Sequence, residues 1–254
     1  MIEVADIHKR FGPQLVLRGT SLTIQDGEAV VIIGRSGGGK SILLKHLIGL
    51  LSPDQGHVYV QGQDLATLGE RDLLKVRRRF GMLFQMAALF DSLTVYENVS
   101  FVLRREGRHT DAEMQRLVAE ALEMVDLPGI EHKMPAELSG GMRKRVGLAR
   151  AIVYRPEIVL YDEPTTGLDP IASSVIDDLI RRVWRQLKVT SIAVTHDMKS
   201  ARTISDRILM LHEGRIYAEG PTADILGSSD PIIYNFVNGI DTELAPEKHS
   251  AAAT

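Results

Sequence analysis

The feature of this chain that most constrains its fold is an eight-residue stretch, 34–41, with the sequence Gly-Arg-Ser-Gly-Gly-Gly-Lys-Ser. It lies directly after the apolar run 29–33 and directly before the helix-like stretch 42–47. Glycines in such a turn let successive backbone N–H groups point inward around an anion, and the following helix adds its positive end. The stretch therefore predicts a phosphate-binding loop in an α/β fold, with Lys40 placed to reach the β- and γ-phosphates and the Ser41 hydroxyl placed to bind Mg²⁺. The alternative is a glycine-rich turn that holds no ligand.

Three apolar runs, at 29–33, 158–161 and 191–195, are continuous rather than alternating. Such runs are typical of strands that are buried on both faces of a parallel sheet. Helix-like segments lie between them, as the connections of a parallel sheet require. The sequence therefore predicts an α/β protein with a parallel core sheet. Shorter strand-like runs, which fit a small antiparallel sheet, lie at 2–4, 15–17, 21–24 and 58–60.

Between about residues 86 and 137 the pattern changes to helices alone. Thr110 and Glu113 form a capping box, and the apolar positions between 114 and 125 follow the spacing of one helix face. This segment is predicted to be an α-helical subdomain inserted into the α/β core. A further helix is predicted to begin at Asp169-Pro170. Its expected buried residues are Ile171, Val175, Leu179, Ile180, Val183 and Leu187.

The end of the chain differs in character from the rest. A short helix is predicted over 225–237, followed by a polar, Ala-rich segment. We expect one large domain over 1–222 and a C-terminal extension over 223–254, with its last ten residues, 245–254, disordered.

Composition excludes several kinds of function. The chain has no cysteine, which rules out disulfides, thiolate metal sites and thiol catalysis. Its formal charge of −3 at pH 7 provides no global basic field that would recruit nucleic acid or an anionic membrane. There is no signal-peptide pattern at the N-terminus, and no apolar run approaches the roughly 18 residues that span a bilayer. We expect a soluble chain without a nucleic-acid partner, which reaches a membrane only through other proteins.

A second group of residues with chemical potential follows the apolar run 158–161, where Asp162 and Glu163 stand side by side. The end of a strand is where an α/β sheet presents its functional site. Asp162 is placed to hold Mg²⁺ through its water shell, and Glu163 to orient or deprotonate the water that attacks the γ-phosphorus. Alone, the pair could be two solvated acids at the start of a loop. Together with the loop at 34–41 it indicates nucleotide hydrolysis.

A third motif, Leu138-Ser139-Gly140-Gly141-Met142, lies between these two and opens a helix-like stretch. With the three elements in this order, the chain resembles the ATP-binding subunits of ABC transporters over roughly residues 2–220. The resemblance implies a P-loop NTPase (RecA-like) core with the small antiparallel β subdomain and the inserted α-helical subdomain described above.

Other markers of that family can then be located in the chain. Gln85 matches the Q-loop glutamine, which senses Mg²⁺ and contacts the membrane partner, and residues 167–169 match the D-loop. His196 matches the switch histidine that contacts the γ-phosphate, and Phe11 is in the place of the aromatic that stacks on adenine. Read without the resemblance, Gln85, His196 and Phe11 would be ordinary polar or core residues.

The resemblance thus implies a full set of site residues and the cofactors ATP and Mg²⁺. The expected catalytic residues are Glu163 and His196, and the expected metal ligands are Ser41, Gln85 and Asp162. The expected ATP-binding residues are Phe11, Gly34, Arg35, Ser36, Gly37, Gly38, Gly39, Lys40 and Ser41, joined by Ser139, Gly140, Gly141, Met142 and Asp169 from another chain.

Three positions depart from the commonest pattern of the family. Met142 stands where the signature motif usually has Gln, Phe11 where Tyr is usual, and Ile42 where Thr often follows the loop serine. None of the three removes a phosphate or Mg²⁺ ligand. In this family each ATP lies between the phosphate loop of one chain and the signature motif of another, so we expect a head-to-tail homodimer that closes on ATP and opens after hydrolysis.

Within the family, the stretches 84–99, 137–142, 161–171 and 229–239 are similar to those of the Mla-type, Mce-associated phospholipid transport ATPases. That resemblance implies transport of phospholipid between bacterial inner and outer membranes. It also implies an integral-membrane permease dimer, a Mce-domain protein and a STAS-domain subunit as partners, which would hold the chain at the cytoplasmic face of the inner membrane.

Several alternatives stay open from sequence. The ATPase of an importer for a small polar solute, such as an amino acid, has a similar core. A soluble, non-transport ABC ATPase is a second alternative, and a nucleotide-binding scaffold without turnover is a third. The basic cluster at 75–79 fits either a surface for a membrane or partner, or a solvated helix face.

Overall fold

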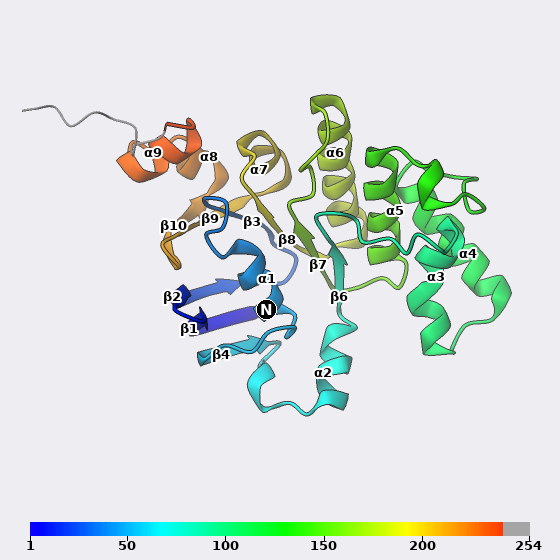
Figure 1. Ribbon diagram of the computed structural model, residues 1–254, viewed down its shortest axis with the longest axis horizontal. Helices are drawn as coiled ribbons and strands as arrows, with labels where there is room; N and C mark the ends of the chain where they lie inside the picture. Colours follow the sequence, from blue (N-terminus) through cyan, green and yellow to red (C-terminus); the bar gives the residue numbers. More distant parts are fainter. Residues whose placement is uncertain (241–254) are drawn as a thin grey trace, which may run out of the picture.

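The computed structural model describes residues 1–240, which form two β-sheets with helices packed around them (Figure 1). The strands of the smaller sheet are β1 (Ile2–Phe11), β2 (Gln14–Ile24), β4 (Gln55–Val60) and β5 (Gln63–Asp64). They are antiparallel and lie in the order β2-β1-β4-β5. The predicted small antiparallel sheet is confirmed, with the runs 15–17 and 21–24 joined in the single strand β2.

The larger sheet carries the predicted parallel core. Its strands are β3 (Ala29–Ile33), β6 (Phe80–Leu83), β7 (Ile158–Asp162), β8 (Thr190–Thr195), β9 (Arg207–His212) and β10 (Arg215–Pro221). Their order is β10-β9-β3-β8-β7-β6, and all neighbours pair in parallel except β9 with β10. The three continuously apolar runs of the sequence are β3, β8 and β7, which lie next to one another in the middle of the sheet.

Helices pack on both faces of the larger sheet and at the two ends of the molecule (Figure 1). They are α1 (Lys40–Leu47), α2 (Glu70–Arg77), α3 (Val95–Glu106), α4 (Asp111–Met124), α5 (Gly140–Ile152), α6 (Pro170–Leu187), α7 (Met198–Ile204), α8 (Thr222–Leu226) and α9 (Pro231–Val237), with 3₁₀ turns at Leu65–Thr67 and Pro135–Glu137. Figure 1 shows α3 and α4 at one end, beyond β6 and β7, and α8 and α9 at the opposite end. No helix within residues 1–240 is long and apolar enough to cross a membrane.

Strand β3 shows why the central runs are apolar at every position. Val30 and Ile32 pack into a core shared with α1 and the smaller sheet. Val31 and Ile33 pack into a second core, formed with α3 to α7 on the other face. Because successive side chains of a strand point to opposite faces, a strand between two cores needs apolar residues throughout.

The inserted helical subdomain is confirmed. Thr110 and Glu113 form the predicted capping box at the start of α4, and Thr94 and Glu97 form a second one, which was not predicted, at the start of α3. The predicted apolar face of α4 is turned toward the core, with Val118 fully buried. Helices α3 and α4 both pack against α5, and this contact joins the insert to the parallel sheet.

Helix α6 begins where the sequence predicts, but part of its predicted burial is wrong. The Asp169 carboxylate caps it by accepting hydrogen bonds from the N–H groups of Ile171 and Ala172, both at 2.9 Å. Ile171 is nevertheless 80% exposed and Val175 is 38% exposed. Since a helix turns by about 100° per residue, repeated steps of four drift around its axis, and these two residues fall off the buried stripe. The stripe consists of Ile176, Leu179, Ile180 and Val183, with Leu187 partly buried.

This difference leads to a stability prediction. Ile180→Ala is expected to lower the free energy of unfolding by about 2–5 kcal/mol, because the side chain is fully buried and its removal leaves a cavity. Ile171→Ala should change it by no more than about 0.5 kcal/mol. Urea denaturation followed by circular dichroism measures both. Equal losses for the two variants would contradict the burial described for α6.

The C-terminal part differs from the prediction in a second respect. The single helix expected over 225–237 is two short helices, α8 and α9, separated by residues 227–230. The break occurs because Asp230 caps a new helix, its Oδ1 accepting from the N–H groups of Ile232 and Ile233, and Pro231 occupies the first turn. The predicted disorder of 245–254 lies outside the described residues. The division of the chain near residue 222 stays a prediction.

Candidate nucleotide site

The glycine-rich loop, residues 34–41, connects the end of β3 to the start of α1. Gly39 has φ +96° and caps α1 without any side-chain hydrogen bond, and a Cβ there would lie 2.9 Å from Val16 Cγ1. The first N–H groups of a helix have no acceptor within the helix, so the start of α1 offers backbone donors and a partial positive charge to an anion. Arg35, Ser36 and Gly37 are exposed, and Gly38 donates its N–H to the carbonyl oxygen of Arg35 at 3.0 Å.

The side chain of Lys40 is buried against the backbone of this loop. Its Nζ donates to the carbonyl oxygens of Gly34 at 2.8 Å and Arg35 at 3.1 Å, and it lies 3.6 Å from Glu163 Oε1. Burial lowers the pKa of the Lys40 ammonium, while the carboxylates of Glu163 and Asp162 oppose this shift. The side chain is therefore a desolvated cation held at the loop, where it can donate hydrogen bonds to phosphate oxygens.

Ser41 and Asp162 come from different elements and meet at the edge of the sheet. Ser41 lies in the first turn of α1, and its Oγ donates to Oδ1 of Asp162, the last residue of β7, at 2.6 Å. Mg²⁺ prefers oxygen ligands and is usually held by one or two protein groups together with phosphates and water. The hydroxyl and carboxylate fit that requirement. Gln85, the third expected ligand, has an exposed side chain in the loop after β6, the strand next to β7.

Glu163 is buried and has an unusual backbone conformation. It is 8% exposed, and its φ of +47° lies in the left-handed region that non-glycine residues rarely adopt. Its Oε2 lies 2.9 Å from His196 Nδ1 and accepts a hydrogen bond from Thr166 Oγ1 at 3.3 Å. His196 directly follows β8, the neighbour of β7. The carboxylate thus lies between Lys40 and His196, where it can orient or deprotonate a water molecule.

The signature residues form a second site on the same chain. Ser139 caps α5, its Oγ accepting from the N–H of Met142 at 3.2 Å. Together with Gly140, Gly141, Met142 and Asp169 it lines a pocket of about 290 Å³ between the starts of α5 and α6. No residue of the loop 34–41 lines this pocket. The structure therefore groups the predicted trans-acting residues with one another and not with the loop.

Two further placements bear on the nucleotide. Phe11 lies at the end of β1 with its side chain 44% exposed, and the ammonium of Lys9 sits 5.7 Å from the centre of its ring. An exposed ring of this kind is available for stacking on a base. The second placement was not predicted: Arg35, Ser36 and His196 share a pocket of about 680 Å³ with the C-terminal helix α9.

The sequence interpretation missed one buried residue of the site, Lys144. Its Nζ donates to the carbonyl oxygens of Gln85 and Glu163. A signal for it exists in the sequence. Lys144, Leu148 and Ala151 follow helical spacing along α5, so a lysine stands on the apolar face of that helix.

A phosphate-binding loop between a central parallel strand and a helix, with paired acids ending a nearby strand, defines a P-loop nucleotide-binding protein. The family model described as "ABC transporter" matches residues 17–166, which is more than half of the chain. The chain belongs to this family.

Known proteins agree with this assignment. The chain is 44% identical to protein TRIGALACTOSYLDIACYLGLYCEROL 3, chloroplastic, of Arabidopsis thaliana, over 94% of this chain and 74% of that protein. It is 38% identical to the intermembrane phospholipid transport system ATP-binding protein MlaF of Haemophilus influenzae, over 94% of this chain and 90% of that one. Among solved structures, the ATP-binding cassette MJ0796, described as a dimer in a post-hydrolysis state bound to ADP and Pi, matches with a TM-score of 0.80 and 33% identity, covering 87% of this chain and 99% of that one.

Proposed function

We propose that this chain hydrolyses ATP to ADP and phosphate, and that the reaction drives a membrane transporter that moves phospholipid between bacterial inner and outer membranes. The observation that carries the proposal is the position of the Glu163 carboxylate, 3.6 Å from Lys40 Nζ and 2.9 Å from His196 Nδ1, beside the Ser41 and Asp162 pair. A carboxylate, a cation and an imidazole at one strand edge suit phosphoryl transfer to water.

The residues have distinct roles in this proposal. Lys40 and the backbone donors of the loop hold the β- and γ-phosphates, while Ser41, Asp162 and Gln85 would hold Mg²⁺. When bound, the metal supplies positive charge that offsets the charge of the phosphate oxygens. Glu163 orients the attacking water and accepts its proton. His196 holds the Glu163 carboxylate and reaches toward the γ-phosphate, and Phe11 stacks on adenine.

A second copy of the chain completes the site. The pocket of about 290 Å³ that Ser139, Gly140, Gly141, Met142 and Asp169 share contains none of the phosphate-loop residues. Each copy therefore brings one half of a site to a head-to-tail dimer. The dimeric state described for the MJ0796 cassette supports this arrangement.

The transported substrate is inferred from the relatives. MlaF is named as part of an intermembrane phospholipid transport system, and this chain covers 90% of it. The implied partners are a permease dimer, a Mce-domain protein and a STAS-domain subunit, and they would hold the chain at the cytoplasmic face of the inner membrane.

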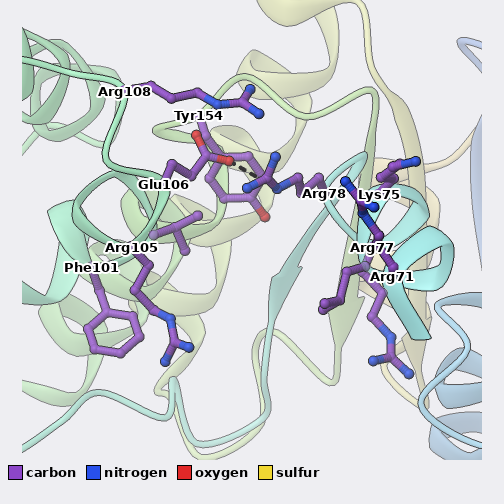
Figure 2. A pocket seen from close by; sticks show the side chains of 11 residues that line it. Arg71, Lys75, Arg77, Arg78, Phe101, Arg105, Glu106, Arg108 and Tyr154 are labelled. Carbon is purple, nitrogen blue, oxygen red and sulfur yellow. Dashed lines mark ion pairs between the residues drawn. The ribbon is translucent and has the colours of Figure 1, made fainter.

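A basic groove between α2 and α3 is the proposed contact with the permease (Figure 2). It has a volume of about 630 Å³ and lies between α2 and α3, the helices that precede β6 and follow the Gln85 loop. Glu106, paired with Arg78 at 3.3 Å, is the one acid among the residues lining it. The groove therefore suits a permease segment that carries both acidic and apolar side chains. Its apolar members are Leu74, Phe101, Val102 and Tyr154, and its basic members are Arg71, Lys75, Arg77, Arg78, Arg105 and Arg108.

Charge reversal in the groove tests the membrane partnership. The double variant Arg105→Glu and Arg108→Glu should reduce the integral-membrane protein recovered with the tagged chain from detergent-solubilised membranes by at least about tenfold, because opposed like charges cost several kcal/mol. Arg185→Glu, an exposed charge reversal on α6, is the matched control. Mass spectrometry of the recovered proteins identifies the partners.

The outcome separates the alternatives. Recovery of no integral-membrane protein with the unaltered chain would favour a soluble, non-transport ABC ATPase. Recovery of a permease together with a solute-binding protein would favour an importer for a small polar solute. A Mce-domain protein among the recovered partners is the result expected for phospholipid transport.

A further inference from the structure

Helix α5 carries two cations that hold backbone carbonyls of other segments. Lys144 is 5% exposed, and its Nζ donates to the carbonyl oxygens of Gln85 and of Glu163, the latter at 3.3 Å. Arg150 donates from its two terminal nitrogens to the carbonyl oxygens of Ala88 at 2.6 Å and Ala87 at 2.7 Å. Helix α5 thus makes hydrogen bonds to two loops that lie far apart in the sequence.

Both loops contain backbone that needs such support. Glu163 has φ +47°, Ala87 has φ +59° and Ala88 has φ +48°, all in the left-handed region. Non-glycine residues persist in this region only where the surrounding structure holds them there. The carbonyl oxygen of each of the three accepts a hydrogen bond from Lys144 or Arg150. The cations of α5 therefore stabilise the strained conformations of both loops.

Close packing brings α5 within reach of these carbonyls. A Cβ on Gly147, midway between the two cations on α5, would lie 3.0 Å from Leu83 Cδ1 and 3.2 Å from Ala87 Cβ. A larger residue would push the helix away from the Gln85 loop. Burial lowers the pKa of the Lys144 ammonium, while the carboxylates of Asp162 and Glu163 oppose this shift. A desolvated cation makes strong, short-range hydrogen bonds, which suits a rigid link.

We propose that Lys144 is a positioning residue for ATP hydrolysis, which fixes the backbone of Glu163 relative to that of Gln85. The proposal rests on the hydrolytic function inferred above. Lys144 has no contact with the nucleotide in this scheme. Its two hydrogen bonds fix the position of Glu163, which orients water, relative to the loop that carries Gln85, an expected metal ligand. The reacting groups therefore keep one geometry.

Two substitutions at this position and one elsewhere test the proposal. Lys144→Met keeps the length of the side chain and removes its donors, whereas Lys144→Gln keeps an N–H donor that can reach one carbonyl. Arg182→Met is the matched control. Arg182 also donates to a backbone carbonyl, that of Met124 at 3.3 Å, and to Asp126 Oδ1 at 2.6 Å, and neither acceptor belongs to residues 84–88 or 163–166.

The expected effect is on kcat and not on KM. Lys144→Met should lower kcat for ATP hydrolysis by on the order of 30-fold to 100-fold, because a small displacement of reacting groups costs about that much. Its KM for ATP should stay within about threefold of the unaltered value. The kcat of Lys144→Gln should lie between those of Lys144→Met and the unaltered chain. Arg182→Met should retain the kcat of the unaltered chain. In the Glu163→Gln background Lys144→Met should cause no further loss, since both changes act through the same group.

Hydrogen–deuterium exchange gives a readout that does not depend on turnover. Lys144→Met should accelerate amide exchange in residues 84–88 and 163–166 together, and Arg182→Met should not. Unchanged exchange in both loops, or a kcat for Lys144→Met within about twofold of the unaltered value, would overturn the proposal. If Lys144→Met does not fold, Lys144→Gln decides by the same measurements, and a kcat equal to that of the unaltered chain refutes it. Absence of turnover in the unaltered chain would refute the hydrolytic function instead, and the exchange measurement would still decide the positioning role.

Discussion

Glu163→Gln is expected to lower the rate of ATP hydrolysis by at least about 10²-fold, equivalent to about 2.7 kcal/mol of transition-state stabilisation. The amide has nearly the same shape as the carboxylate, so the contacts with His196 and Thr166 can be kept. It cannot accept a proton from water, and it removes the negative charge 3.6 Å from Lys40. Steady-state phosphate release, measured with the purified chain at saturating ATP, gives the loss in kcat.

ATP affinity provides the control for this variant. Binding of ATP, followed by fluorescence of a labelled nucleotide, should be as tight as in the unaltered chain or tighter, because a repulsive charge near the γ-phosphate is lost. Activity within about threefold of the unaltered rate would exclude Glu163 as the catalytic base. The absence of measurable hydrolysis in both the variant and the unaltered chain would instead support a nucleotide-binding scaffold without turnover.

Lys40→Ala should weaken ATP binding itself, by about 10-fold to 100-fold. The ammonium is buried at the loop, and a hydrogen bond to a charged group contributes about 1.5–3 kcal/mol. Its removal also leaves the carbonyl oxygens of Gly34 and Arg35 without the donor that they share. Isothermal titration with ATP and Mg²⁺ measures the change in Kd.

A matched lysine on the same helix controls for this effect. Lys45 lies in the last turn of α1 and is not part of the loop, so Lys45→Ala should leave the Kd for ATP unchanged. Unaltered affinity in Lys40→Ala would overturn the assignment of residues 34–41 as the phosphate-binding loop. A loss of equal size in both variants would point to disruption of α1 instead.

Local patterns in the sequence predict much of the fold, because their causes are local. The Gly-rich turn, the capping box of Thr110 and Glu113 and the continuously apolar run of β3 each follow from a few neighbouring residues. The two-sided burial of β3 then follows from the need to cover a parallel sheet on both faces. The glycine-rich loop and the paired acids indicated Lys40, Ser41, Asp162 and Glu163, and the family resemblance added His196. The structure places these five residues together at one edge of the sheet.

Features that depend on long-range geometry were not predicted from the sequence. Ile171 is exposed because it lies on a side of α6 that does not face the core. A list of the apolar positions in the sequence does not show which side of the helix faces the core. Lys144 was not singled out from the sequence, because its acceptors are carbonyl oxygens 59 and 19 residues away. The break between α8 and α9 does have a local cause, since Asp230-Pro231 is a helix start of the same kind as Asp169-Pro170.

The shared strand β3 has a thermodynamic consequence for the whole molecule. Its alternating side chains belong to both hydrophobic cores, and the phosphate-binding loop begins directly after its last residue. The loop cannot be released by unfolding one core while the other stays intact, since β3 would have to leave both. A ligand that binds the folded loop and not the unfolded chain therefore stabilises both cores together, because the strand that supports the loop belongs to both.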